Sequence, residues 1–405
     1  MIETVIKQEL EKDVNGKIDK DQFGNQKGIS TTHLLTKFMN EAFKSTDIDN
    51  ATTAVTIDYS KAFDYVDHTI LIEKLIALGV RKELINIIIS FLKNRTHCTV
   101  LAGKSSPFLI ITCGVPQGTC LGPLLFIILT NGGTNPLVSN FKYMDDNTLL
   151  YSYKGDSTDT IQAALDIESD EAKKNKMKIN SSKCHAITFN FSGKNTEPKN
   201  LTLNGEVIQS CDKINLLGVT ITKDLKWNAN TEVICEKVNS KLYILGKLKY
   251  FGLKMKELVN FWKCVLRPLT EYASPLWYSG LTQYDIDRIE SLQKKALGII
   301  CGIEYKDMKR YYKLNNKLVG YEEALEGLGL APLVDRRIIL GKKFALQSSD
   351  SGKHEDILIP TENPTNTRNQ AKFVVPFFSK ERGRNSAVTS MVNILNEVSR
   401  NNNTK

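Results

Sequence analysis

The sequence predicts a multi-domain α+β protein whose first half carries strands between helices and whose second half is helical. Three observations support this fold class. Short segments rich in β-prone residues recur before residue 225, whereas apolar residues recur at helical spacing from Trp227 onward. The chain also has 405 residues, which is more than one ordinary hydrophobic core organises.

In the first half, we expect a helix over 31–43 and a strand over 54–58 (AVTID). A helix follows this strand, since Leu71, Leu75 and Leu78 stand at helical spacing. The later elements expected here are a helix over 82–94, a hairpin over 98–113, the loop GVPQGT, an apolar segment over 121–129, a hairpin over 141–151, a helix over 158–176, and strands over 185–191, 201–208 and 216–225.

In the second half, three apolar stripes predict three helices. The stripes are Ile234, Val238, Leu242 and Leu245; then Leu258, Phe261 and Val265; then Ile286, Ile289, Ala296 and Ile300. Beyond about Gly302 the periodicity weakens, and we expect the polar end SRNNNTK to be frayed or disordered.

The basic excess lies in the second half. The net charge is +9, and from Lys226 onward 29 Lys and Arg face 19 Asp and Glu, which leaves 25 against 26 before it. This distribution suits a protein that binds a polyanion with one lobe and carries out chemistry in the other. A solvated surface on a mildly basic protein is the alternative.

The composition favours an intracellular protein that does not enter a membrane. The longest apolar run, residues 124–129, is much shorter than a membrane span, and residues 1–13 lack the apolar stretch of a signal peptide. The eight cysteines form no CxxC pair, so neither a disulfide framework nor a zinc site is expected. A reducing compartment, the nucleus or cytoplasm, follows.

The segment FKYMDDNTLLY places Asp145 and Asp146 between two strand-like runs. These residues suit an ordinary turn. Asp58, however, stands at the end of another strand, and three carboxylates would converge if the two strands were neighbours in one antiparallel sheet. Their mutual repulsion would raise their pKa values, and a divalent ion would relieve it. Carboxylate oxygens suit Mg²⁺ or Mn²⁺, and two such ions can activate a 3′-hydroxyl and neutralise a leaving pyrophosphate.

Several motifs carry a family resemblance. AVTIDYSKAFDYVDH, GVPQGTCLGPLLF and YMDD closely resemble, in order and separation, the three core palm motifs of reverse transcriptases of non-LTR (LINE-like) retrotransposons. DQFGNQKGISTTHLL resembles their finger motif. KINSSKCHAITF and INLLGVTITKDLKW resemble the motifs that follow the active site, and EYASPLWYSG and IESLQKKALGII resemble the helical region after the palm. The resemblance extends from residue 1 to about 300, with weaker similarity to 395.

The resemblance implies a right-hand polymerase with partial fingers (1–53), a palm on a small antiparallel sheet (54–225, with finger-side helices about 69–112), a helical thumb (226–302) and a C-terminal helical extension (303–405). Its activity would be RNA-directed DNA synthesis, with an RNA template, a DNA primer or RNA/DNA duplex, and deoxynucleoside triphosphates as partners.

Two departures from the family pattern bear on activity. The family carries an Ile-Asn-Asp triplet where this chain reads Thr130-Asn131-Gly132, which would loosen the approach to the catalytic hairpin. The chain also begins after the expected first finger strand, and we expect a polymerase-region fragment without the endonuclease. An inactive nucleic-acid-binding remnant is therefore the alternative function. A third possibility, an RNA-dependent RNA polymerase, is disfavoured by Phe63.

The resemblance implies that Asp58 and Asp145 bridge two Mg²⁺ ions and that Asp146 assists. Asp64 and Asp67 belong to the same segment, but they lie at the start of a helix, where a carboxylate favours the helix N-terminus. We interpret these two as structural.

For the nucleotide, the resemblance implies that Phe63 lies beneath the sugar, although an ordinary core aromatic is equally compatible with its chemistry. Tyr59, Gln117 and Gly118 would bind the substrate, since glycine lets the backbone approach the base pair. Lys27, in the finger loop, would meet the triphosphate.

Lys183 matches the lysine expected near the departing pyrophosphate, as a proton donor or a stabilising charge. A solvated loop lysine is the alternative. Leu217 and Gly218 would position the primer end. The basic helices after Trp227 would hold the duplex by its phosphates, with contacts that are independent of sequence and sensitive to salt.

Overall fold

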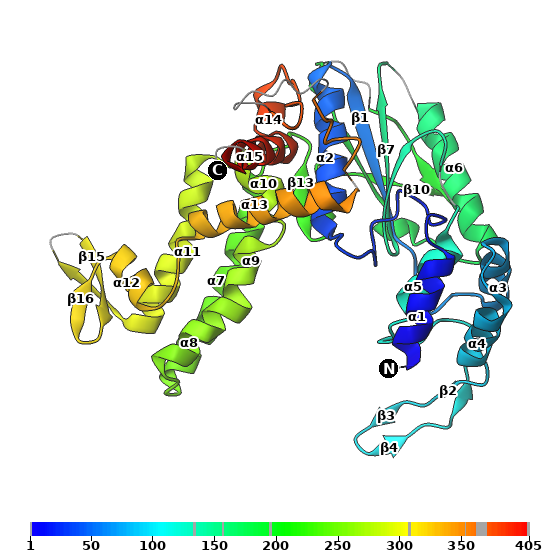
Figure 1. The fold of residues 1–405 in the computed structure, drawn as a ribbon, viewed down its shortest axis with the longest axis horizontal. Helices are drawn as coiled ribbons and strands as arrows, with labels where there is room; N and C mark the ends of the chain where they lie inside the picture. The colour runs from blue at the N-terminus through cyan, green and yellow to red at the C-terminus, as the bar shows by residue number, and fades with distance from the viewer. Residues whose placement is uncertain are drawn as a thin grey trace. The chain divides into compact units, whose positions relative to one another are not determined.

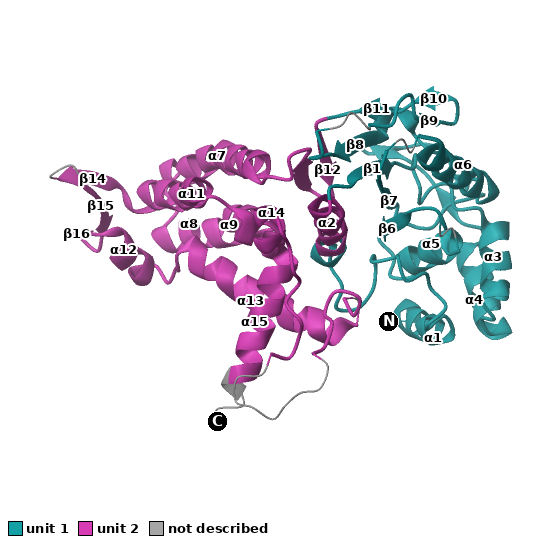
Figure 2. Ribbon diagram, turned by 90° about the horizontal axis from the view of Figure 1, so that it is seen from above, with its two compact units in different colours: residues 1–34, 49–211 teal, residues 35–48, 212–405 magenta. Residues whose placement is uncertain are grey.

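The computed structural model describes residues 2–132, 135–155, 158–193, 197–306, 309–352, 354–361 and 371–402. The chain forms two compact units (Figure 2). Unit 1 comprises Met1–Leu34 and Asp49–Cys211, and unit 2 comprises Leu35–Ile48 and Asp212–Lys405. Among the described residues, no helix combines the length and apolar character that crossing a membrane requires.

Unit 1 is built on a five-stranded sheet with the order β11-β8-β1-β7-β6. The central strand β1 pairs antiparallel with both β7 and β8, and it is buried along almost its whole length, which explains its continuous run of Ala, Thr, Val and Ile. The strands are β1 (Ala51–Ile57), β6 (Ser139–Tyr143), β7 (Asp146–Tyr153), β8 (His185–Phe189) and β11 (Gln209–Ser210). The predicted strand over 54–58 and the predicted hairpin over 141–151 are confirmed.

Helices pack around this sheet in two clusters (Figure 1). One cluster joins α1, α3, α4 and α5, and seven of the nine α5 residues are buried, which accounts for the apolar run over 121–129. The other packs α6 against side chains of β1, β7 and β8. The helices are α1 (Ile2–Asp13), α3 (His68–Ala77), α4 (Lys82–Leu92), α5 (Gly122–Thr130), α6 (Thr158–Lys174) and the short 3₁₀ helix η1 (Ser181–Lys183).

The hairpin expected over 98–113 is a long arm that continues from α4 (Figure 1). Its base is formed by β2 (Thr96–His97) and β5 (Leu109–Ile110), and its tip by β3 (Val100–Leu101) and β4 (Lys104–Ser105). The residues of these four strands are exposed.

Two segments predicted as single strands are hairpins. Residues 201–208 form β9 (Thr202–Leu203) and β10 (Glu206–Val207), and the region predicted as a strand over 216–225 contains the end of β12 (Lys213–Leu216) and β13 (Val219–Thr222). The reversals occur at Asn204-Gly205 and at Leu217-Gly218, where all four residues have positive φ angles. Asn-Gly is a strong hairpin signal, so the single-strand predictions overlooked a turn.

Unit 2 is mainly helical. The stripe Ile234, Val238, Leu242 and Leu245 is buried, as predicted. The second stripe is only partly correct, because Val265 is 40% exposed. A π-helical segment, η2 (Trp262–Leu266), interrupts the α-helical spacing there and rotates the residues that follow. The longer helices are α2 (Thr31–Asp47, shared with unit 1), α7 (Asn228–Tyr250), α8 (Met255–Phe261), α11 (Gln283–Cys301), α13 (Leu333–Ser351) and α15 (Ala387–Asn402).

The C-terminal region begins with a three-stranded sheet and is helical after it. The weak periodicity of its sequence did not predict this sheet. The strands are β14 (Ile303–Lys306), β15 (Lys309–Leu314) and β16 (Lys317–Val319). The remaining elements of unit 2 are α9 (Arg267–Glu271), α10 (Ser274–Trp277), η3 (Tyr278–Gly280), α12 (Tyr321–Gly327) and α14 (Glu381–Arg384). Helix α15 runs to Asn402, into the segment expected to be frayed or disordered, and residues 403–405 lie outside the described residues.

Candidate functional site

The sheet register brings the three predicted carboxylates to one end of unit 1. Ile57, the last residue of β1, pairs with Asn147 of β7. Asp58 follows Ile57 directly, and Asp146 precedes Asn147, while Asp145 stands in the turn between β6 and β7. The prediction that the two carboxylate-bearing strands are neighbours in one antiparallel sheet is therefore confirmed.

The turn that carries Asp145 is tightly held. Tyr143 pairs with Asp146, and Met144 between them has a φ of 59°, which a non-glycine residue rarely adopts. The buried side chain of Gln22 accepts hydrogen bonds through Oε1 from the backbone N–H of Met144 (3.0 Å) and of Gly24 (2.7 Å). A Cβ on Gly24 would lie 2.6 Å from the nitrogen of Met144, so only glycine fits this approach.

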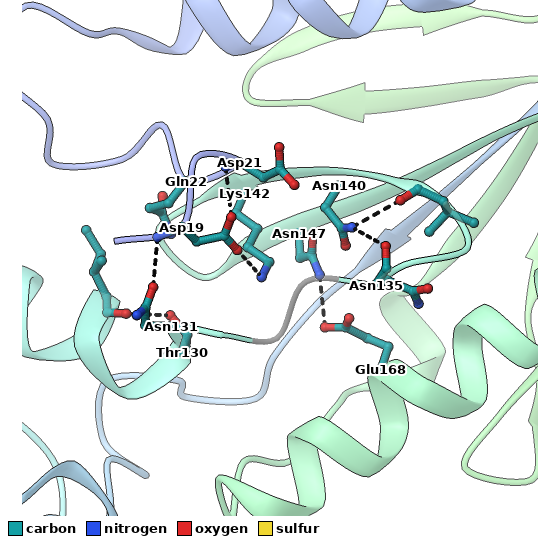
Figure 3. A network of polar contacts seen from close by, with 12 residues as sticks. Asp19, Asp21, Gln22, Thr130, Asn131, Asn135, Asn140, Lys142, Asn147 and Glu168 are labelled. Atoms are coloured by element: carbon teal, nitrogen blue, oxygen red, sulfur yellow. Dashed lines mark hydrogen bonds and ion pairs between the residues drawn. The ribbon is translucent and has the colours of Figure 1, made fainter. Parts of the chain in front are cut away.

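A buried ion pair lies behind the turn (Figure 3). Lys142 Nζ lies 2.9 Å from Asp19 Oδ2, and each side chain is only 8% exposed. Asn131 holds the segment that contains Asp19. Its Oδ1 accepts from the N–H of Asp19 (2.8 Å), and its Nδ2 donates to the carbonyl of Lys17 (3.0 Å). In this structure the Thr130-Asn131-Gly132 departure therefore leaves an anchored chain at Asn131 rather than a loosened one.

A second buried carboxylate lies beside the same end of the sheet. Glu168 of α6 accepts through Oε1 from Nδ2 of Asn147 at 2.9 Å (Figure 3). The same oxygen accepts from the hydroxyl of Tyr59. Burial and the adjacent charge of Glu168 raise the pKa of Tyr59 well above its ordinary value. Because the Tyr59 hydroxyl donates to Glu168, the predicted role of Tyr59 in substrate binding would fall to its backbone or its ring.

Sequence reasoning missed Gln22 and Glu168. Glu168 had a readable signal, since it occupies the apolar stripe of α6 formed by Ile161, Leu165 and Ala172. A charged residue at such a position must find partners when it is buried. Gln22 had no readable signal in the sequence, because its role depends on the backbone of a residue that is distant in sequence.

The carboxylates influence one another electrostatically. Partial burial raises the pKa of Asp145, and the charge of Asp58 raises it further. Burial also raises the pKa of Asp146, with added contributions from Asp145 and Asp58. Even so, among the residues that the structure describes, no three His, Cys, Asp or Glu side chains form a group that could hold a metal ion. The strand ends that carry the three carboxylates thus lie together as predicted, but their side chains do not form a metal-binding group in this structure.

The predicted pyrophosphate lysine lies near Asp58. Lys183 Nζ is 3.9 Å from Asp58 Oδ2, and the lysine side chain is 67% exposed. An ion pair this long and this exposed contributes little to stability, so Lys183 remains available to a ligand. Lys27 is also exposed, in the loop after Gly24.

The residues predicted to contact the nucleotide differ in their surroundings. Phe63 is half-buried, and its ring stacks on that of the fully buried Phe126 with 4.6 Å between the ring centroids. Gln117 is exposed and donates from Nε2 to Asp64 Oδ1 (3.2 Å), and both residues line a pocket of about 480 Å³. Gly118 has a φ of 77° and open space where a Cβ would stand.

The interpretation of Asp67 as structural is confirmed. Its side chain caps α3 by accepting from the N–H groups of Thr69 and Ile70, both at 3.0 Å. The hydrogen bond from Lys176 is the largest cause that lowers the pKa of Asp67, and the capping bonds lower it further. Together they outweigh burial, which would raise this pKa.

Leu217 and Gly218, predicted to position the primer end, form the β12–β13 turn in unit 2. The hydroxyl of Tyr272 donates to the carbonyl of Leu217 (2.6 Å), and a Cβ on Gly218 would lie 3.3 Å from the Tyr272 ring. The turn is therefore fixed within its own unit.

Comparisons with known proteins agree with these observations. Residues 1–221 match the family described as reverse transcriptase (RNA-dependent DNA polymerase). The chain is 27% identical over 322 residues to the RNA-directed DNA polymerase from mobile element jockey of Drosophila melanogaster, which covers 75% of this chain and 34% of that protein. It is also 27% identical over 314 residues to the probable RNA-directed DNA polymerase from transposon BS of the same species, covering 70% of this chain and 33% of the relative.

The chain thus spans about a third of the length of these curated relatives. Among solved structures, a telomerase from Candida tropicalis in complex with a fragment of telomeric RNA is similar at a TM-score of 0.44 and 12% identity, over 73% of this chain and 45% of that one. The family match covers 221 of the 405 residues, and it includes Asp58, Asp145 and Asp146. The chain therefore belongs to the reverse transcriptase family.

Proposed function

We propose that this chain is an RNA-directed DNA polymerase region that extends a primer on an RNA template by two-metal nucleotidyl transfer. The observation that carries the proposal is the β1–β7 register, which sets Asp58 beside the Asp145-Asp146 turn. Family membership supports the same reaction class.

The donor chemistry fits a hard divalent cation. Asp58 and Asp145, assisted by Asp146, would hold two Mg²⁺ ions, with Mn²⁺ as a substitute, because carboxylate oxygens are the ligands that these ions prefer. Burial and, as a smaller cause, the neighbouring carboxylates raise the pKa values of Asp145 and Asp146, and bound cations would favour the ionised forms. When bound, such ions supply activation of the 3′-hydroxyl and neutralisation of the leaving pyrophosphate.

The other site residues take their proposed roles from their positions. Phe63 would carry the sugar of the incoming deoxynucleoside triphosphate, since the half-buried ring has a firm support in Phe126. Gln117 and Gly118 would approach the base pair. Lys183 would meet the departing pyrophosphate, which its exposure and its 3.9 Å separation from Asp58 support.

The proposed division into fingers (1–53), palm (54–225), thumb (226–302) and C-terminal extension (303–405) assigns duplex binding to the helices of unit 2. Charge supports this assignment, because the segment 237–256 carries six lysines and no Asp or Glu. Nonspecific phosphate contacts of this kind strengthen at low salt.

The direct test is incorporation of dTTP on a poly(rA) template with an oligo(dT) primer, in the presence of Mg²⁺. We expect extension by the chain as it stands. Binding of the primer–template without any extension, in Mg²⁺ or in Mn²⁺, would instead identify a nucleic-acid-binding remnant. A poly(rA)-dependent incorporation of UTP on an RNA primer at equal efficiency would favour an RNA polymerase.

A further inference from the structure

We infer that Glu168 is a positioning residue, which aligns the two chain segments that carry the catalytic carboxylates. This inference rests on the proposed function, because it concerns the same site. It adds a residue on a different element, α6, to the carboxylates of the β1 and β7 segments.

The geometry is a bridge from a single atom. Oε1 of Glu168 accepts from Nδ2 of Asn147 (Figure 3) and also from the hydroxyl of Tyr59. Tyr59 is the residue directly after Asp58, and Asn147 is the residue directly after Asp146. One buried oxygen therefore joins the immediate chain neighbours of both carboxylate positions.

The bridge stands where the backbone stops providing alignment. The β1–β7 ladder ends at the pair Ile57 and Asn147, so Asp58 lies beyond its last pair. Past this point Tyr59 leaves β7 and forms a bridge with Ile179 instead. The link from Tyr59 through Glu168 to Asn147 thus reconnects two segments that no longer pair.

Burial gives this link its strength. Glu168 is only 4% exposed, and Asn147 is 5% exposed, so water does not compete effectively for these hydrogen bonds. A hydrogen bond to a carboxylate is roughly twice as strong as one between neutral groups. The helix itself does not depend on Glu168, because Ile161, Leu165 and Ala172 anchor α6 in the core.

The consequence concerns metal affinity. Outer-sphere hydrogen bonds orient ligands, and losing one costs about 10-fold to 100-fold in metal affinity or activity. Without the bridge, Asp58 and the Asp145-Asp146 turn would be free to separate. We expect this to weaken cation binding while the primer–template, which unit 2 is proposed to hold, binds as before.

The experiment compares three variants with wild type. Glu168→Leu removes the acceptor and keeps an apolar side chain on the α6 stripe, and Glu168→Gln retains an acceptor oxygen. Tyr153→Phe is the matched control, because its hydroxyl bonds to Thr53 Oγ1 (3.0 Å) in the same sheet, at the opposite end of β1. Mn²⁺ binding is titrated by electron paramagnetic resonance without nucleotide or template, and the Mg²⁺ dependence of extension and the melting temperature are measured beside it.

We expect Glu168→Leu to weaken Mn²⁺ binding and to raise the Mg²⁺ concentration for half-maximal extension by about 10-fold. Glu168→Gln should restore most of this loss, and Tyr153→Phe should lower the melting temperature without changing either metal value. Unchanged metal affinity in Glu168→Leu, with a lowered melting temperature, would show that Glu168 only supports the core and would overturn the inference.

The Mn²⁺ titration separates this inference from the proposed function. If wild type binds Mn²⁺ but extends no primer, the proposed polymerase activity fails, while the comparison of variants still decides the role of Glu168. If wild type extends primers and Glu168→Leu matches it in both metal measurements, only the role of Glu168 fails.

Discussion

Asp145 stands in a two-residue turn whose other member, Met144, already has a left-handed backbone. Replacing Asp145 with Asn keeps the shape of this turn and removes one oxygen ligand and one negative charge. We expect Asp145→Asn to abolish extension and to leave duplex binding intact or slightly tighter, because a negative charge disappears beside the phosphates. The measurement is primer extension beside a binding titration, and extension at the wild-type rate would reject the assignment of Asp145.

Phe63 tests whether the product is DNA. If its ring lies under the incoming sugar, it excludes a 2′-hydroxyl by overlap, and Phe63→Val should raise ribonucleotide incorporation strongly. The ring is half-buried and rests on Phe126 on one side, so its truncation should cost less than the 3 to 5 kcal/mol that is typical when a fully buried Phe is cut to Ala.

The check for Phe63 is the ratio of incorporation efficiencies for a deoxynucleotide and its ribonucleotide, measured together with the melting temperature. Phe126→Leu serves as a comparison, since Phe126 is fully buried and its substitution should mainly lower the melting temperature. A ratio that does not move in Phe63→Val, together with a collapse in melting temperature, would make Phe63 an ordinary core aromatic.

Single residues were predictable where chemistry and local pattern coincide. The sequence pattern predicts Asp58, Asp145 and Asp146 as carboxylates at strand ends, and it predicts Asp67 as a residue at a helix start. Gln22 does not, because its importance lies in two backbone N–H groups, one of them on Met144 far along the chain. Such contacts exist only once the segment around Gln22 lies against β6.

Among the elements, α7 carries the surface proposed to grip the duplex. Lys247 is exposed, with its Nζ over the rings of Tyr243 (5.4 Å) and Tyr250 (5.9 Å). Lys249, by contrast, donates to the carbonyl of Ile299 on α11 (2.6 Å). The three lysines Lys241, Lys247 and Lys249 are thus not equivalent, although all three lie in the basic helical region after Trp227 that was predicted to hold the duplex by its phosphates.

Neutralising Lys241, Lys247 and Lys249 together to Gln should weaken binding of an RNA/DNA duplex and flatten its salt dependence, with little change in nucleotide KM. Lys247→Gln alone should account for more of the change in salt slope than Lys249→Gln, because the Lys249 ammonium is already engaged. Lys173→Gln, an exposed lysine on α6, is the control. A salt slope that stays the same in the triple variant would show that these lysines face solvent.

Element prediction succeeded where one period dominated. The α7 stripe follows from burial of one face, and so does the helix begun by Asp67. The β1 strand is buried along almost its whole length, and its run of β-prone and small residues predicted it. It failed where the chain changes conformation within a few residues. The π-helical segment at Trp262–Leu266 shifts Val265 off its stripe, and the Leu217-Gly218 turn reverses a segment that is apolar on both sides. Periodicity over a longer window averages such local changes away.

At the scale of the whole molecule, unit 2 is assembled from parts of the chain that lie far apart in sequence. Residues Leu35–Ile48, which include most of α2, belong to it together with everything from Asp212 onward. The end of α2 is tied to the C-terminal region, because Asp47 accepts from the N–H of Ser379 and of Lys380, both at 2.8 Å, and Arg382 donates to the carbonyl of Thr46 (2.9 Å). No local pattern predicts a contact over more than 330 residues.

This tie predicts how the stability of unit 2 depends on pH. Burial alone would raise the pKa of Asp47, but the hydrogen bonds from Ser379 and Lys380 outweigh it and lower the pKa below the ordinary value of 3.8. The ionised carboxylate therefore contributes stability that is fully present above pH 3.8 and is lost as the pH falls through the lower, folded-state pKa. Asp47→Ala should reduce the free energy of unfolding at pH 7 by about 1 kcal/mol, since the site is partly exposed and screened.

Denaturant unfolding at pH 7 and at successive values down to pH 3 measures the difference between wild type and Asp47→Ala. The difference should narrow below pH 3.8, because the wild-type carboxylate takes up a proton and its bonds from the two N–H groups weaken. Glu236→Ala, at an exposed position on α7, should show neither the loss at neutral pH nor the narrowing. A difference that is constant across this range would mean that Asp47 acts through packing, and that the charge holding the C-terminal region to α2 lies elsewhere.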